Sequence, residues 1–243
     1  MSDEIEGRAP EVEAEIVVDT SPSPLPRKPL DQMRILRAAV DFIDTNGLAK
    51  LTMRRLGAHL GVEAMALYRY VPGREQLLDG VVEVVMDELY EETTAGGLST
   101  SWQEYLQMHA HAVRALALAH PRIFPLVATR PPAAPWLRPP LRSLRWVEGF
   151  LAGLREYGFS PQVSVAAYRS FATFLLGSLL LETGTLEDLT ITEKVNLAFI
   201  ESDDLAGYPI ISEMADQLKE GAFAGEFEDA LEDLIERVAV LKG

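Results

Sequence analysis

The sequence predicts an all-α protein in which three short helices are followed by a long helix and a larger helical domain. Apolar residues recur three and four positions apart along most of the chain, which is the period of an amphipathic helix. The alternating apolar and polar pattern of a half-buried strand is absent from the sequence. With 243 residues, 48% of them hydrophobic, the chain can bury a sizeable core in one large domain or in a small domain attached to a larger one.

Residues 1–29 form the first predicted segment, and we expect them to be disordered. They are acidic at first and then rich in proline and serine, in the run TSPSPLPRKP, with no sustained apolar periodicity. The segment lacks a basic start followed by an apolar run, so no signal peptide is expected. The absence of cysteine fits a reducing compartment, and we expect the protein to be cytoplasmic.

Residues 30–74 are predicted to fold as three helices. The run DQMRILRAAVDFIDTNG has an aspartate cap, an apolar face and an Asn-Gly stop, which describe an amphipathic helix. Thr52 can cap a second, short helix, and Gly61 can adopt the backbone angles of a tight turn after it. A third helix is expected from about Glu63 to Tyr70, where the run VPG ends it. Two short helices separated by a glycine-containing turn form a helix-turn-helix arrangement.

The third predicted helix has one side to pack and one side to present. The side expected to pack is formed by Glu63, Ala66, Leu67 and Tyr70. The opposite side is formed by Ala64, Met65, Tyr68 and Arg69. This second set offers a small residue, an apolar side chain able to touch a thymine methyl group, a phenol and a cation, which suits the major groove of DNA. The alternative is that Met65 and Tyr68 pack on another helix.

The distribution of charge supports the DNA interpretation. The chain has a net charge of -15, which alone would argue against a nucleic-acid partner. Between Arg27 and Glu75, however, nine Lys or Arg residues face five Asp or Glu residues, a local net charge of +4. The acidic remainder would discourage indiscriminate coating of DNA and favour docking through the basic end.

Residues 75–243 are predicted to form the larger helical domain. A long helix over residues 74–92 leads into it, and further helices are expected at 101–119, 121–129, 140–157, 160–183, 187–199, 211–221 and 226–241. The last helix and the apolar helix around residues 171–181 would supply half of a four-helix dimer interface. The predicted interface residues are Phe171, Leu175, Leu231, Leu234, Ile235 and Val238. Alternatively, both helices are internal core of a monomer.

The most apolar stretch of the chain, residues 163–181, raises the question of a membrane span. Polar residues such as Arg169 and Thr173 interrupt it, so we expect a buried helix and no membrane partner.

Enzymatic motifs are missing from the sequence. There is no HExxH pair, no phosphate-binding glycine loop and no G-x-S-x-G elbow. His109 and His111 are two positions apart, so on a helix they point to different sides and cannot clamp one metal ion. The sequence therefore predicts neither catalytic residues nor a metal site.

On these motifs the sequence resembles the TetR family of transcriptional regulators. The run ILRAAVDFIDTNGLAKLTMRRLGAHLGVEAMALYRYVPGREQLLDGVVE has the family's spacing from the first helix through the connecting fourth helix. The body resembles the tetracycline-repressor branch, with SWQEYL, TRP, YGFSP and FEDALEDLIERV in similar order. The resemblance covers residues 30–241. It implies an N-terminal helix-turn-helix DNA-binding domain joined by a long helix to a ligand-binding and dimerisation domain, in a homodimer that binds a palindromic operator.

The resemblance also assigns roles to residues of the helix-turn-helix. Arg54 matches a base-reading position, and a bidentate arginine on guanine is worth about 1 to 3 kcal/mol. The residues matching the base-contacting face are Ala64, Met65 and Tyr68. The residues matching positions that grip phosphates are Thr52, Tyr70 and Arg74. Arg55 and Arg69 are expected to be nonspecific phosphate partners or solvated surface.

A ligand cavity below the fourth helix is a further implication of the resemblance. The candidate lining residues are Tyr90, His109, Val113, Leu126, Trp146, Phe150 and Thr173. This aromatic and apolar set suits a largely hydrophobic small-molecule effector with a few polar anchors. Tetracycline repressors have histidine at the position of Tyr90, asparagine at that of His109 and a metal-binding histidine at about Leu126. Since leucine cannot ligate Mg²⁺, we expect no cofactor and no Mg²⁺-tetracycline effector.

Two functions from different classes follow. The first is a ligand-responsive DNA-binding regulator, most simply a repressor released by its effector. The alternative is a helical small-molecule-binding or interaction protein whose helix-turn-helix no longer reads DNA.

Overall fold

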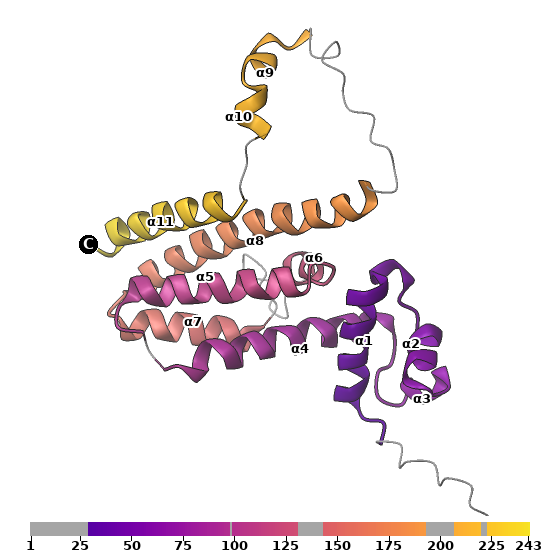
Figure 1. The fold of residues 1–243 in the computed structure, drawn as a ribbon. Coiled ribbons are helices and arrows are strands. Elements are labelled where there is room, and N and C mark those ends of the chain that lie inside the picture. The colour runs from indigo at the N-terminus through magenta and orange to yellow at the C-terminus, as the bar shows by residue number, and fades with distance from the viewer. Residues whose placement is uncertain (1–28, 98, 131–142, 193–206, 220–222) are drawn as a thin grey trace, which may run out of the picture. The chain divides into compact units, whose positions relative to one another are not determined.

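The computed structural model describes residues 29–97, 99–130, 143–192, 207–219 and 223–243. Within these ranges all regular structure is helical, so the predicted all-α class is confirmed (Figure 1). The predicted disorder of residues 1–29 concerns a segment that lies, up to residue 28, outside the described residues. Residues 193–199 of one predicted helix also lie outside them.

Side-chain N-caps mark the first residues of helices α1 and α2. Helix α1, Gln32–Asn46, starts at Asp31, whose carboxylate Oδ1 accepts from the Arg34 backbone N–H at 2.7 Å. Helix α2, Met53–Leu60, starts at Thr52, whose hydroxyl accepts from the Arg55 N–H at 3.2 Å. A short 3-10 helix, η1, Leu48–Lys50, lies between them and was not predicted.

A tight turn separates α2 from α3. Gly61 ends α2 with φ of 70°, the left-handed conformation in which glycine avoids the strain of a side chain. Helix α3, Ala64–Leu67, is shorter than expected, because the chain passes into a turn at Tyr68. The helix-turn-helix is therefore present, but the predicted end of its second helix at Tyr70 is wrong.

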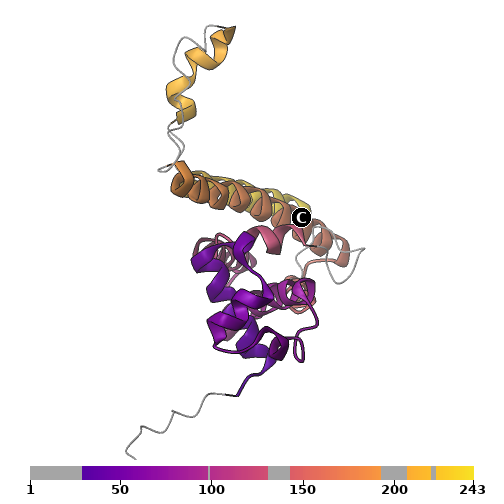
Figure 2. The same cartoon turned by 90° about the vertical axis from the view of Figure 1, so that its right-hand side faces the viewer.

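The long helix α4, Arg74–Ala95, connects the first three helices to the rest of the fold. It contacts α1 near its beginning and α5, α6 and α7 further along. The side chains that join α1, α2, α3 and α4 are fully buried and include Ile35, Ile43, Leu56, Leu67 and Leu77. Figure 2 shows α1, α2 and α3 grouped together around the start of α4.

The larger helical part begins with α5, Trp102–Ala119, α6, Phe124–Thr129, and α7, Leu144–Glu156. Ser101 and Ser143 cap α5 and α7 by accepting from the N–H three residues ahead, at 3.2 Å in both cases. Helix α6 starts later than the predicted Pro121. Helix α7 lies beside α4 and α8, and α5 lies beside α4, α8 and α11.

Helix α8, Pro161–Thr192, corrects the predicted break after Thr183. The hydroxyl of Thr183 donates to the carbonyl of Leu179 at 2.7 Å, a bond inside the helix that leaves the backbone ladder intact. A single glycine such as Gly184 costs a helix only about 1 kcal/mol, which tertiary packing overcomes. The predicted helix at 211–221 is also corrected, to the two short helices α9, Pro209–Glu213, and α10, Ala215–Lys219.

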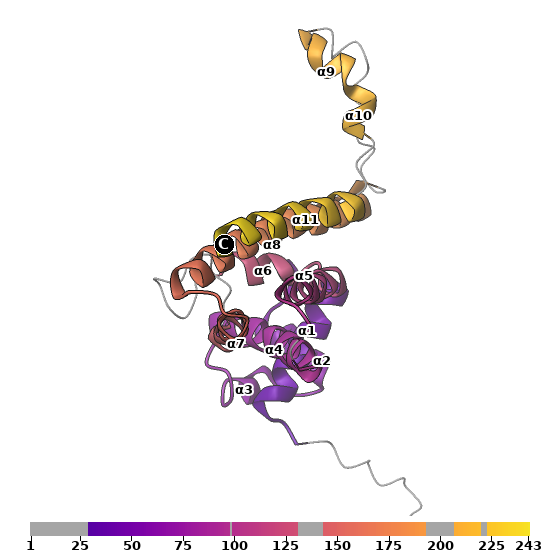
Figure 3. The same ribbon diagram turned by 90° about the vertical axis from the view of Figure 1, so that its left-hand side faces the viewer.

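Helix α11, Phe223–Lys242, runs beside α8 in Figures 1 and 3, and the two helices are in contact. The segment Pro161–Gly184 is long and apolar enough to cross a membrane by length and composition alone. It contains fully buried residues, among them Ala167, Phe171 and Leu175, and α8 contacts α5, α6, α7 and α11. It is a core helix of this fold.

The side chains predicted for a dimer interface are used inside one chain. All six, at positions 171, 175, 231, 234, 235 and 238, are at most 9% exposed in the single chain. They pack α8 and α11 together and against neighbouring helices, because they occupy the inward stripes of these helices. Only Leu234 also borders a groove on the outer side of the pair, together with Arg169, Thr173 and Arg237.

Candidate nucleic-acid interface and ligand pocket

The helix-turn-helix presents apolar and aromatic side chains to solvent. Met65 is 77% exposed and Tyr68 is 44% exposed, so within the described residues neither is packed on another helix. Leu67, on the opposite side of α3, is fully buried, as predicted. Glu63 and Tyr70 were predicted to pack but are exposed. Glu63 precedes the helix as its cap residue, and Tyr70 follows its end, so neither keeps the helical phase on which that prediction relied.

Basic side chains surround this exposed surface. Arg54, Arg55, Arg69 and Arg74 are all exposed. Arg55 Nη1 donates to the Lys50 carbonyl at 3.2 Å, and Arg74 Nε donates to the Leu51 carbonyl at 3.5 Å. These bonds fix the guanidinium group of Arg55 near the start of α2 and that of Arg74 at the start of α4. Thr52 is exposed at the N-terminus of α2, and Ala64 is half-buried at the start of α3.

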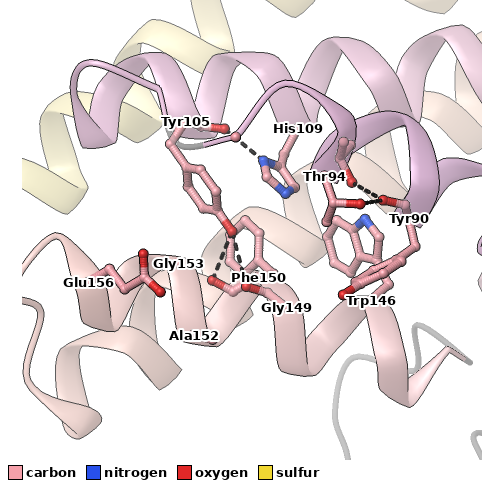
Figure 4. Close-up of a pocket in the computed structure, with 12 residues that line it drawn as sticks. Tyr90, Thr94, Tyr105, His109, Trp146, Gly149, Phe150, Ala152, Gly153 and Glu156 are labelled. Carbon is pink, nitrogen blue, oxygen red and sulfur yellow. Dashed lines mark hydrogen bonds between the residues drawn. The ribbon is translucent and has the colours of Figure 1, made fainter.

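A pocket of about 260 Å³ lies between α4, α5 and α7 (Figure 4). Four of the seven predicted lining residues border it, namely Tyr90, His109, Trp146 and Phe150. Val113 and Leu126 are buried but do not line it, and Thr173 faces the outer groove between α8 and α11.

Sequence reasoning missed several residues of the pocket. They are Thr93, Thr94, Gly97, Tyr105, Gly149, Ala152, Gly153 and Glu156. Tyr105 lies one helical turn before His109, so the signal for it was the shared face of α5. Gly149 and Gly153, one turn apart on α7, are positions where α7 approaches aromatic rings closely.

Tyr105 spans the pocket from α5 to α7. Its hydroxyl is within 3.2 Å of the carbonyls of both Gly149 and Phe150, to which it can donate. A Cβ atom at residue 153 would collide with this phenol, so glycine is required for the approach. Burial raises the pKa of the Tyr105 phenol, which therefore stays neutral at physiological pH.

His109 is buried beside Tyr105, and its Nδ1 donates to the Tyr105 carbonyl at 2.9 Å. Burial lowers the pKa of this histidine from its usual 6.5 to about 4, since the charged ring would lose its hydration. At neutral pH the ring is uncharged with its proton on Nδ1, which leaves Nε2 as an acceptor. The indole nitrogen of Trp146 is also buried, and no acceptor among the described residues pairs with it.

Two polar contacts connect the segment between α5 and α6 to α1, and a third connects the end of α6 to α4. His120, which follows α5, has its Nδ1 2.6 Å from Oδ2 of Asp44 on α1. Arg122 donates to the Asp44 carbonyl at 2.6 Å. Arg130, which follows α6, donates from Nη2 to Asp79 Oδ1 on α4 at 2.6 Å. The hydrogen bond to Asp44 raises the pKa of His120, against a smaller opposing effect of burial.

Within the described residues, no group of three histidine or acidic side chains is placed to hold a metal ion. Leu126, at the position that the resemblance relates to a metal-binding histidine, is a buried apolar residue of α6.

Family models cover most of the chain. Residues 95–240 match the tetracyclin repressor-like C-terminal domain, and residues 35–81 match the bacterial regulatory proteins of the tetR family. The chain belongs to the TetR family of transcriptional regulators. It thus has a helix-turn-helix DNA-binding domain followed by the larger helical domain typical of these regulators, which are generally not enzymes.

Individual TetR-family proteins show similarity over much of this chain. The HTH-type transcriptional repressor DrrR1 of Streptomyces coeruleorubidus is 31% identical over 166 residues, which are 68% of this chain and 58% of that repressor. This chain therefore spans less than two thirds of that relative's length. The tetracycline repressor protein class A from transposon 1721 of Escherichia coli is 28% identical over 183 residues, 71% of this chain and 81% of that protein.

Among solved structures, a possible TetR family transcriptional regulator from Streptomyces coelicolor A3(2) has a TM-score of 0.67 and 29% sequence identity. The similarity covers 87% of this chain and 100% of that one, so it extends over both the helix-turn-helix and the larger helical domain.

Proposed function

We propose that this TetR-family protein is a cytoplasmic, ligand-responsive repressor that binds a palindromic operator as a homodimer and is released by a small-molecule effector. The observation that carries the proposal is the exposed face of α3, where Met65 and Tyr68 have no packing role but lie among exposed arginines. Residues 30–74 would read DNA, and residues 75–243 would bind the effector and the second subunit.

The DNA contacts are assigned by exposure and chemistry. Arg54 reads a base, and the α3 residues Ala64, Met65 and Tyr68 face the floor of the major groove. Thr52, Tyr70 and Arg74 contact phosphates, and Arg55 and Arg69 add nonspecific attraction. A single such domain has too small a surface for tight specific binding, so two copies on adjacent half-sites are required.

Effector binding reaches the DNA through α4. This helix starts at Arg74, beside the reading surface, and its other end supplies Tyr90, Thr93 and Thr94 to the pocket. An effector releases the operator only if it binds the DNA-incompetent arrangement more tightly than the competent one. A ligand indifferent to the position of α4 would leave repression unchanged.

The second subunit binds at the outer face of α8 and α11. A groove there is bordered by Arg169, Thr173, Asp233, Leu234 and Arg237, and Val240 near the end of α11 is 83% exposed. Opposite charges and apolar side chains on one surface suit a self-complementary, two-fold contact. The six interface residues predicted from the sequence lie behind this surface, where they pack α8 and α11 together.

Selection from a random pool of duplex DNA at physiological salt tests the proposal. Enrichment of a palindrome is expected, and Arg54→Ala should lower affinity for it at least tenfold while the dimer and its helix content persist. Arg37→Ala makes the same change of charge at an exposed position of α1 and serves as the matched control. No enrichment, or equal losses in the two variants, would favour the helical binding protein that no longer reads DNA.

A further inference from the structure

Met65 and Tyr68 form an exposed apolar patch on α3 that the fold does not use. Met65 is 77% exposed and lies between Ala64 and Ala66, which are both half-buried. Single exposed apolar side chains are common on protein surfaces, but Met65 is followed three positions later, on the same side, by Tyr68, which is also exposed. Within the described residues, no helix covers this patch, so it is available to a partner.

The backbone that carries Met65 is held in place by α2. The two helices approach closely at Gly57, where an added Cβ atom would lie 2.9 Å from the Val62 carbonyl oxygen and 3.2 Å from the Ala64 nitrogen. The Val62 N–H donates to the Gly57 carbonyl at 2.9 Å, and Leu67, on the opposite side of α3, is fully buried. Because this support fixes the position of α3, little ordering of the backbone is needed when a partner binds Met65.

The charges around the patch favour a polyanionic partner. Between residues 48 and 74 the chain carries five Lys or Arg residues and one acidic residue, Glu63. Arg54 on α2 and Arg69, directly after Tyr68, are both exposed. In duplex DNA the phosphates would meet these cations, while the base edges between the two phosphate backbones would meet the apolar patch.

The side chain of Met65 matches one chemical feature of the major groove. Its thioether has no N–H or O–H donor and is only a weak acceptor, and the alanines on either side of it end in methyl groups. Guanine, adenine and cytosine present hydrogen-bonding atoms in the major groove, whereas thymine also presents a 5-methyl group. An apolar side chain over a polar base edge would remove its water without pairing it, so the thymine methyl group is the matching contact.

We propose that Met65 reads the 5-methyl group of a thymine in each half-site of the operator. This inference rests on the proposed function, because it takes α3 to lie in the major groove, and it adds the base feature that α3 recognises. The recognised chemistry is a methyl group on C5 of a pyrimidine, so 5-methylcytosine would present it as well. Met65 then discriminates between bases by apolar contact, whereas Arg54 does so by hydrogen bonds.

Removal of methyl groups from the operator tests the proposal. The palindrome enriched by the full-length protein is synthesised with each symmetric pair of thymidines replaced in turn by deoxyuridine, which lacks only the methyl group. Fluorescence anisotropy should show a pair whose replacement weakens binding by about 4-fold for one half-site and about 15-fold for both, as expected for exposing one methyl group per subunit. A cytosine at this position should bind more weakly than a 5-methylcytosine by a similar factor.

Met65→Ala identifies the side chain that senses the methyl group. This variant should bind the thymidine and deoxyuridine operators equally at that position, whereas Met33→Ala should keep the preference of the unmodified protein. Met33 is the matched control, because it is an exposed methionine of α1 and does not lie on α3. Both methionines are exposed, so both variants should keep the helix content of the wild type in circular dichroism. The four affinities form a double-mutant cycle that isolates the contact between Met65 and the methyl group.

Several results would overturn the proposal. They are an operator in which no thymine methyl group affects binding, a methyl preference that survives in Met65→Ala, and equal binding of the cytosine and 5-methylcytosine operators. The first and the last need no variant, so they decide the question even if Met65→Ala does not fold. A protein that enriches no palindrome refutes the proposed regulator and the methyl contact together. A protein that enriches a palindrome but does not respond to its methyl groups refutes only the methyl contact.

Discussion

His109 should make the protein sensitive to acid. Its pKa is about 4 in the folded chain and near 6.5 when the ring is hydrated. As the pH falls below about 6.5, the unfolded chain takes up a proton that the folded chain refuses until about pH 4, so stability falls within this window. Each pH unit is worth about 1.4 kcal/mol, and the full effect is therefore about 3 kcal/mol, of which about 2 kcal/mol is reached near pH 5.

The matched variant is His109→Asn, which keeps a short donor toward the Tyr105 carbonyl but does not titrate between pH 4 and 8. Urea unfolding followed by far-ultraviolet circular dichroism, at equal protein concentrations, gives the free energy of unfolding of both proteins at about pH 8 and about pH 5. The wild-type protein should lose about 2 kcal/mol more than the variant between these two conditions. The contribution of His120 is common to both proteins and cancels in the difference.

Parallel losses of stability in the two proteins would refute the reasoning. They would mean that the ring of His109 is hydrated, and the pocket would then be open to water on its α5 side.

Three further predictions concern other contacts. Asp44 raises the pKa of His120, so the stability that this pair contributes is fully present below about pH 6.5 and is lost as the pH rises through the raised pKa. Asp44→Asn should remove this loss of stability. In the variant, a nuclear magnetic resonance titration should show the pKa of the His120 ring closer to 6.5. Gly153→Ala sets a methyl group against the buried tyrosine hydroxyl and should cost about 1 to 3 kcal/mol of stability in thermal denaturation. Gly184→Ala is the control, because nothing lies near its added methyl group, and it should be neutral or slightly stabilising. Leu234→Asp should weaken the dimer in sedimentation experiments and operator binding with it, and a fully dimeric variant would contradict the proposed interface.

Local rules predicted the beginnings of the N-terminal helices well. Asp31 and Thr52 were read as caps from their residue types and positions, and both accept the backbone hydrogen bonds of a cap. Helix ends were predicted less well, because they depend on tertiary packing. Helix α3 ends at Leu67 although its sequence continues a helical pattern, and α8 continues past Thr183 although the sequence offers a glycine.

The pocket was only partly predictable, for a geometric reason. Helical periodicity identifies the inward side of one helix, but it does not tell which neighbouring helix that side will meet. His109 and Trp146 were assigned to the pocket with the help of the resemblance, and the structure places both in its lining. Thr173 was assigned in the same way, but the rotation of α8 turns it to the outer face. Tyr105 shares a face of α5 with His109, which was the available signal, but the contact of its hydroxyl with α7 depends on how the two helices pack and does not follow from the sequence of α5.

In the proposed regulator, the length of α4 would convert a small change at the pocket into a large displacement at the DNA-binding end. Its 22 residues rise about 1.5 Å each, so the helix is a lever of about 33 Å with the pocket near one end and Arg74 at the other. A tilt of about 5° at the pocket end displaces the far end by about 3 Å, close to the rise of 3.4 Å between successive phosphates along one strand. In a dimer, opposite tilts of the two α4 helices would change the separation of the two helix-turn-helix domains by about 6 Å, or about two base pairs of a rigid duplex.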